Sequence, residues 1–161
     1  MKPRISLQDQ QGNVRSLEQL EGSFVVAYFY PKDFTSGCTR EACDFRDAAA
    51  ELASLGAKVV GISRDTSPSH AKFDAKHGLG FTLLSDPDNA TAKAWGAWGA
   101  KNLYGKKVEG VKRSTFLIGP DGEVLREWMN VKVDGHAAAV VAALREIRSG
   151  VSPAAKKPAA K

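Results

Sequence analysis

The sequence predicts an α/β fold with a mixed central sheet flanked by helices. Apolar segments typical of buried strands alternate along the chain with segments whose apolar residues recur at helical spacing. Such alternation indicates parallel strands covered by helices on both faces, and a late strand–turn–strand segment adds antiparallel pairing. The length of 161 residues and the apolar fraction of 43% favour a single soluble domain, which we place at residues 1–150.

The first predicted elements lead from the amino end to a long helix. Gln11-Gly12-Asn13 is typical of the turn of a short hairpin, whose strands lie around residues 5–7 and 14–15. Residues 24–30 are almost continuously apolar and aromatic, as expected of a central strand covered on both faces. The apolar spacing then predicts a helix from about residue 36 to residue 55.

Strands and helices continue to alternate through the second half of the chain. The helix after the strand at 59–63 takes Ser67 as its N-cap and Pro68 as its first helical residue. Asp86-Pro87 predicts a similar start for a helix that reaches Trp95. This order of elements suits a three-layer sheet of thioredoxin type with an N-terminal hairpin extension. The other predicted elements are a strand at 81–84, strands at 113–118 and 123–129 joined by a turn, and a final helix that Asp134 caps and Gly150 closes.

The net charge of +5 is partly a property of the carboxyl end. The segment 151–161 reads VSPAAKKPAAK, and its three lysines leave a net charge of +2 for residues 1–150. We predict that this basic Ala/Lys/Pro tail is disordered, and we expect no nucleic-acid-binding face elsewhere. No apolar run approaches the roughly 20 residues that span a bilayer, and no signal-peptide core is present. We therefore expect a cytoplasmic protein without membrane association.

The two cysteines, Cys38 and Cys43, are too few for a disulfide framework. Their C-x4-C spacing differs from the C-x2-C of zinc ribbons and thioredoxin-type redox motifs. The histidines at 70, 77 and 136 are scattered and form no close group with the cysteines, so we expect no four-ligand zinc site. We expect all three histidines to be surface or cap residues, because no partner for them stands nearby in the sequence.

The surroundings of Cys38 favour a reactive thiol. Cys38 falls in the first turn of the predicted helix, where unpaired N–H groups and the helix dipole favour the thiolate, which is the nucleophilic form. Pro31 fixes the chain as it leaves the strand, and Gly37 allows close approach of a small ligand. The hydroxyl of Thr35 could hydrogen-bond both the thiolate and an oxygen-containing substrate. The alternative is that both cysteines are simply small buried residues.

Cys43 lies about one and a half turns beyond Cys38 on the same predicted helix. On ideal helical geometry their Cα atoms are about 8.6 Å apart, whereas a disulfide requires less than about 7 Å. Any bond between the two sulfurs therefore requires the first turns of the helix to unwind.

The spacing of Pro31, Thr35 and Cys38 matches the active-site signature of the peroxiredoxins. The run YFYPKDFTSGCTREACDFRD at 28–47 resembles the peroxiredoxin Q subfamily, also called bacterioferritin comigratory protein. The similarity covers about residues 4–148. Further matching blocks stand at 81–86, at 98–99 with 104–106, and at 110–118. Two departures are Ser36, where the subfamily often has proline, and a short amino end without an Ala-Pro-x-Phe element.

The resemblance implies roles for individual residues. Cys38 would be the peroxidatic cysteine and Cys43 the resolving one, as in an atypical two-cysteine peroxiredoxin, and Arg113 would complete the site with Thr35 and Pro31. The implied substrates are hydrogen peroxide and alkyl hydroperoxides. The implied reductant is thioredoxin or a similar dithiol, with no metal, haem or flavin, and the subfamily favours a monomer.

Other interpretations stay open at this point. A thiol–disulfide oxidoreductase could use the same fold, although the C-x4-C spacing and the pair Thr35 and Arg113 argue against it. A protein that binds nucleic acid through its lysine-rich tail is a second alternative. Away from the motif, we expect core or pocket-wall positions for Trp95, Trp98 and Phe116. We expect a largely solvated helix face for Arg40, Glu41 and Arg46, with Glu41 or Arg40 able to tune the site.

Overall fold

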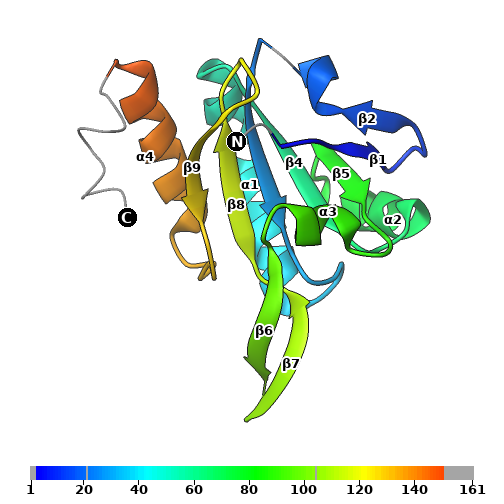
Figure 1. Ribbon diagram of the computed structural model, residues 1–161. Coiled ribbons are helices and arrows are strands. Elements are labelled where there is room, and N and C mark those ends of the chain that lie inside the picture. The colour runs from blue at the N-terminus through cyan, green and yellow to red at the C-terminus, as the bar shows by residue number, and fades with distance from the viewer. Residues whose placement is uncertain (1–2, 21, 104, 151–161) are drawn as a thin grey trace.

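The computed structural model describes residues 3–20, 22–103 and 105–150, and within them a mixed central sheet is flanked by helices (Figure 1). The strand order in the sheet is β2-β1-β5-β4-β3-β8-β9. The predicted α/β fold of thioredoxin type is therefore confirmed. The strands are β1 (Ser6–Gln8), β2 (Val14–Ser16), β3 (Phe24–Phe29), β4 (Ala57–Ser63), β5 (Thr82–Ser85), β8 (Ser114–Ile118) and β9 (Val124–Trp128).

The helices and a separate ribbon complete the fold. The helices are η1 (Leu17–Leu20), α1 (Ser36–Ser54), α2 (Ser67–His77), α3 (Ala90–Ala94) and α4 (His136–Arg148). The ribbon consists of β6 (Trp98–Leu103) paired with β7 (Lys106–Val111), and it projects away from the sheet (Figure 1). None of the helices among the described residues is long and apolar enough to cross a membrane.

Strand β3 lies at the centre of the sheet and contributes to two hydrophobic clusters. It pairs in parallel with β4 and antiparallel with β8. Because successive side chains of a strand point to opposite faces, Val26 and Tyr28 join the cluster under α1, α2 and α4, whereas Val25 and Phe29 join the cluster under α3. This burial on both faces explains why residues 24–30 are almost continuously apolar.

The helix starts differ from the sequence prediction because other residues supply the caps. Thr66, not Ser67, is the N-cap of α2, and its hydroxyl accepts the N–H of Ser69. The final helix takes Gly135, in a left-handed conformation with φ of 72°, as its N-cap, while Asp134 forms an ion pair with Arg40 instead. Gly78, in a left-handed conformation with φ of 59°, caps the end of α2.

The third helix is shorter than predicted. It starts at Ala90 because Asn89 adopts a left-handed conformation that a continuous helix from Asp86 excludes. The carboxylate of Asp86 nevertheless accepts the N–H groups of Thr91 and Ala92, so this residue still satisfies donors at the helix start. The ribbon of β6 and β7 has no counterpart in the predicted elements. The tail predicted to be disordered, 151–161, lies outside the described residues.

Candidate active site

Cys38 lies in the first turn of α1, directly after the connection that leaves β3. The cysteine is almost completely buried, with 1% of its surface exposed, and both cysteines are free thiols. Thr35 is the N-cap in an extended conformation, and its carbonyl accepts the first helical bond, from the N–H of Thr39. The N–H groups of the residues before Thr39 therefore lie ahead of the first helical hydrogen bond. The positive end of the helix dipole lies at Cys38.

Arg113 meets Cys38 across the sheet. It directly precedes β8, whose first residue, Ser114, pairs with Phe29 at the end of β3. This register brings the arginine to the point where the chain enters α1, and its Nη2 donates to Cys38 Sγ over 3.4 Å. A Cβ atom on Gly37 would lie 3.3 Å from the same Nη2, so glycine leaves room for this contact.

Glu41 is buried at this site, although its charge predicts an exposed position on the helix. Its exposed fraction is only 1%, not that of a solvated helix face, and its Oε1 accepts Nη1 of Arg113 over 2.6 Å. Burial raises the pKa of Glu41 to about 7, although the charge of Arg113 opposes the shift. A signal was present in the sequence, because Glu41 stands three residues after Cys38 and four before Phe45, on the buried stripe of α1.

The single guanidinium of Arg113 contacts two acidic groups, the carboxyl group of Glu41 and the thiol of Cys38. Burial lowers its pKa, but the charges of Glu41 and Cys38 outweigh burial and raise it above its ordinary value. The planar fork directs Nη1 to the carboxylate and Nη2 to the sulfur. Arg113 therefore remains a cation whose direction is fixed by two partners.

Thr35 and Pro31 lie in the same connection, 30–35, but neither is in hydrogen-bond contact with the sulfur. The hydroxyl of Thr35 donates to the carbonyl of Lys32 over 2.8 Å, so it spans the loop instead of donating to the Cys38 thiol. Pro31 forms part of the wall of a cavity of about 310 Å³ between this loop and the ribbon of β6 and β7. Trp98 contributes to the same wall, as expected from the sequence.

Cys43 shares an unbroken helix with Cys38. Both lie within α1, which is continuous from Ser36 to Ser54, and the side chain of Cys43 is half-buried. The two thiols are therefore held on one rigid element, as the helical spacing predicts, and their joining requires unwinding at its start.

Two of the three histidines are buried, contrary to expectation. His70 is fully buried and contacts Asp33, and His136 is buried with its Nε2 2.7 Å from the hydroxyl of Thr115. Burial, with the charge of Arg113, lowers the pKa of His136 to about 4, so the ring is neutral at pH 7. The partners come from distant segments, which is why the sequence did not reveal them. His70 nevertheless stands three residues before the core residue Phe73, which is a helical signal of burial.

A buried cysteine at a helix start, facing a guanidinium on a thioredoxin-like sheet, is the arrangement of a thiol-dependent peroxidase. The comparisons with known proteins agree. The chain matches the AhpC/TSA family over residues 1–126. It is 42% identical over 145 residues to peroxiredoxin Bcp of Bacillus subtilis, covering 90% of this chain and 92% of that protein. The chain therefore belongs to the AhpC/TSA family, in its peroxiredoxin Bcp group, also called peroxiredoxin Q.

Solved structures share the same fold over nearly the whole domain. The bacterioferritin comigratory protein of Xanthomonas campestris, studied for its alkyl peroxide reduction activity, superposes with a TM-score of 0.84 at 45% identity. That superposition covers 89% of this chain and 92% of the other. The peroxidoxin BcpB of Mycobacterium tuberculosis gives a TM-score of 0.79 at 40% identity, covering 89% and 93% of the two chains.

Proposed function

We propose that this peroxiredoxin reduces hydrogen peroxide and organic hydroperoxides through Cys38, resolves the oxidised form through Cys43, and is recycled by thioredoxin. Membership of the family supports peroxide as the substrate and a thiol as the reductant. The observation that carries the assignment to Cys38 is the contact of its sulfur with Arg113 at the start of α1. Both the guanidinium and the helix dipole stabilise a thiolate more than a thiol.

In the first step the Cys38 thiolate attacks the terminal peroxide oxygen. The O–O bond breaks, the sulfur is oxidised to a sulfenic acid, and water or an alcohol leaves after taking up a proton. Nη2 of Arg113 is 3.4 Å from Cys38 Sγ. From this position it can also stabilise the negative charge that develops on the peroxide oxygens. Thr35 and Pro31 shape the loop beside the sulfur, and no metal or organic cofactor takes part in the proposed scheme.

In the second step the sulfenic acid is converted to a disulfide. The first turns of α1 unwind, the thiol of Cys43 attacks Cys38 Sγ, and the sulfenic oxygen leaves as water. A dithiol reductant, for which we propose thioredoxin, then reduces the disulfide by two exchange steps and is itself oxidised. We place the reaction in the cytoplasm, where such a reductant is available, and assign it to a monomer built on the domain 1–150.

Peroxide consumption with thioredoxin, its reductase and NADPH tests the scheme. We expect turnover in the wild type and none in Cys38→Ser, because the nucleophile is lost. Cys43→Ser should complete one round of peroxide reduction and then lose recycling by thioredoxin. Unimpaired turnover in Cys38→Ser would refute the assignment of the nucleophile.

Mass spectrometry tests the resolving role separately. Wild-type protein treated with one equivalent of peroxide should lose two hydrogens, localised to the peptide that contains Cys38 and Cys43. If the peptide instead carries an added oxygen and no such loss, the enzyme works with one cysteine. Insulin reduction without peroxide would point to the rival thiol–disulfide oxidoreductase.

A further inference from the structure

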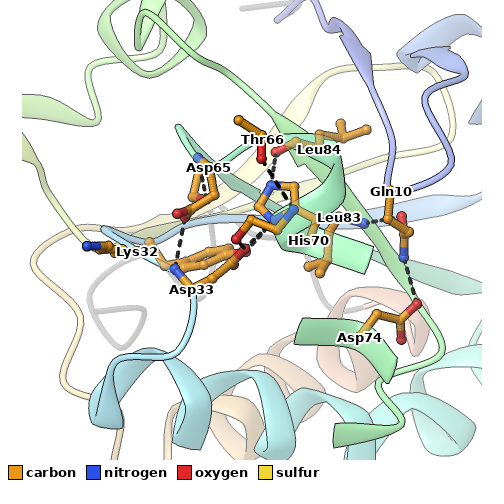
Figure 2. Close-up of polar contacts among 12 residues, drawn as sticks. Gln10, Lys32, Asp33, Asp65, Thr66, His70, Asp74, Leu83 and Leu84 are labelled. Atoms are coloured by element: carbon orange, nitrogen blue, oxygen red, sulfur yellow. Dashed lines mark hydrogen bonds and ion pairs between the residues drawn. The ribbon is translucent and has the colours of Figure 1, made fainter. Parts of the chain in front are cut away.

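A buried polar network lies outside the cysteine site, directly behind the loop that carries Pro31 and Thr35. Its centre is Asp33, 3% exposed, and His70, 0% exposed, whose Oδ2 and Nδ1 atoms are 2.7 Å apart (Figure 2). On its other side His70 places Nε2 2.9 Å from the carbonyl of Leu84. Two buried polar side chains so far inside the protein require a full set of partners.

The hydrogen-bond inventory shows that the network is complete. Asp33 accepts the hydroxyl of Tyr30 over 2.6 Å and that of Ser69 over 2.8 Å. Burial raises the pKa of Tyr30 well above its ordinary value, so the phenol keeps the proton that it donates. The Leu84 carbonyl only accepts, so Nε2 of His70 carries a proton. On the other side of the ring, Nδ1 and Asp33 Oδ2 form a short hydrogen bond of 2.7 Å.

A metal ion is not needed to explain this cluster. Asp33, Asp65 and His70 bring possible ligand atoms within 4.8 Å of one another. However, Asp65 Oδ2 already accepts the N–H of Asp33 over 2.8 Å and the hydroxyl of Ser63 over 2.6 Å. Asp65 Oδ2 is therefore already occupied by two donors of the protein itself.

The network attaches the loop to three neighbouring strands. β3, β4 and β5 run parallel, so their carboxyl ends meet at one edge of the sheet. Asp33 follows β3, Asp65 follows β4, and the Leu84 carbonyl belongs to β5. His70 adds α2 to this set. Asp33 is thus held twice, by its side chain through His70 and by its backbone N–H through Asp65 (Figure 2).

Phe34, which follows Asp33, has a strained backbone conformation. We call the contacts of Asp33 with His70 and Asp65 the anchor of this loop. Phe34 has a φ of 68°, a left-handed conformation that non-glycine residues rarely adopt, and its side chain is 48% exposed. Its ring still contacts that of Phe73 on α2, with centroids 5.1 Å apart. Such a conformation persists only where the surroundings enforce it. Here Asp33 fixes one side of Phe34, and the start of α1 fixes the other.

We propose that Asp33 and His70 are a positioning pair that holds the loop so that α1 starts with Cys38 facing Arg113, and that sets the point beyond which the helix unwinds. The proposal rests on the proposed function, because it concerns the equilibrium between the folded helix start that reacts with peroxide and the unwound start that forms the disulfide. Neither residue touches the sulfur. Their effect passes through Phe34 and Thr35 to the first turn of α1.

The proposal predicts a split between the two chemical steps. Without the anchor, a larger fraction of molecules has an unwound helix start, and the apparent rate of the first step falls with the competent fraction. Disulfide formation draws on the unwound form, so it becomes faster. In His70→Leu we expect oxidation of Cys38 by peroxide to be several-fold to roughly tenfold slower and disulfide formation to be several-fold faster. His70→Asn, which keeps a donor towards Asp33, should lie between this variant and the wild type.

Rapid quenching with a thiol-blocking reagent, followed by mass spectrometry, measures the two rates in one experiment. Val25→Ala is the matched control, because Val25 is a buried residue at the opposite end of β3 from the loop. The control lowers the melting temperature without touching the anchor. Hydrogen–deuterium exchange over residues 34–43 should be faster in His70→Leu than in Val25→Ala.

Each outcome decides the proposal. The proposal is supported if three changes occur only in the His70 variants. These are a slower first step, a faster second step and faster exchange over residues 34–43. Unchanged rates, or equal changes in Val25→Ala at the same melting temperature, overturn it. If wild-type protein forms no disulfide, the proposed resolving role fails, and the anchor is judged by the first step and by exchange alone. If His70→Leu does not fold, His70→Asn supplies the same comparison.

Discussion

At the scale of single residues, the guanidinium of Arg113 organises the site. Its two nitrogens reach Cys38 and Glu41 at the same time, which a single-point cation such as lysine cannot do. Glu41 in turn has an Oε2 atom without a hydrogen-bond partner among the described residues, so its carboxylate is held by Arg113 alone. The orientation of the Arg113 side chain therefore depends on Glu41, whose carboxyl group does not react in the proposed thiol chemistry.

Arg113→Lys tests the need for this two-point geometry. We expect the rate constant of Cys38 oxidation by hydrogen peroxide to fall roughly 100-fold, because a lysine ammonium cannot keep both contacts and the charge moves off the sulfur. The rate follows from competition for peroxide with a reporter peroxidase. Arg145→Lys, at an exposed arginine that pairs with Glu51, is the control and should react like the wild type. A loss in Arg113→Lys of less than about threefold would contradict the argument.

At the scale of single elements, the proposed cycle makes two opposing demands on the start of α1. It must be ordered to place Cys38 against Arg113, and it must unwind if Cys43 is to reach the sulfur. Ser36 is its first residue, and the preceding Thr35 has the extended backbone that a following proline requires, with φ of −82° and ψ of 154°. The first helical position accepts proline without losing a hydrogen bond.

Ser36→Pro should stabilise the helix start and slow its opening. Proline reduces the freedom of the unfolded chain, so we expect the free energy of unfolding to rise by about 0.4–1 kcal/mol. Disulfide formation after peroxide treatment should become slower, while the first oxidation step is kept. Urea denaturation measures the stability, and quenched mass spectrometry measures the bond formation. Ser54→Pro, at the far end of the helix, should instead destabilise the protein.

The predictable parts of this protein are those written in local patterns. The helix carrying Cys38 follows from apolar spacing, and the strand before it follows from its apolar run. Caps were less predictable, because Thr66 and Ser67 are both suitable residues and only the backbone decides between them. Asp33 and His70 could not be paired from the sequence, because their contact depends on how α2 packs against the loop after β3.

Arg113 shows the same limit at the candidate active site. Its contact with Cys38 depends on the register of β8 on β3, which no spacing in the sequence reveals, and only its match to the peroxiredoxin pattern indicated it beforehand. The peroxiredoxin pattern did not indicate Glu41. Its charge favoured an exposed position, although its spacing on α1 is that of a buried residue. Charge alone is therefore a poor guide where a distant arginine supplies the partner.

At the scale of the whole molecule, the response of stability to pH combines two buried groups of opposite sign. The pKa of Glu41 is raised to about 7, so folding favours its neutral form, and its contribution to stability is lost as the pH rises from about 4.5 to 7. The pKa of His136 is lowered to about 4, so its contribution is lost as the pH falls from about 6.5 to 4. The two slopes oppose each other.

Single substitutions should separate the two opposing contributions to the pH dependence of stability. Each shift corresponds to a change on the order of 3 kcal/mol across its window. Relative to wild type, Glu41→Gln should lose stability on acidification from pH 7 to 4.5, because the His136 term is then unopposed. His136→Gln should gain stability over the same range. Urea denaturation at several pH values gives both slopes, and parallel curves for the two variants would refute the linkage.

The ribbon of β6 and β7 has a consequence for protein engineering. It leaves and rejoins the body at one point, where the N–H of Lys112 donates to the carbonyl of Ala97 over 2.7 Å. The next residue, Arg113, is positioned by the register of β8, not by the ribbon. We therefore expect changes on the exposed surface of the ribbon to leave the guanidinium in place. Lys107, an exposed residue of β7, is a suitable position for a fluorescent label on an enzyme that must remain active.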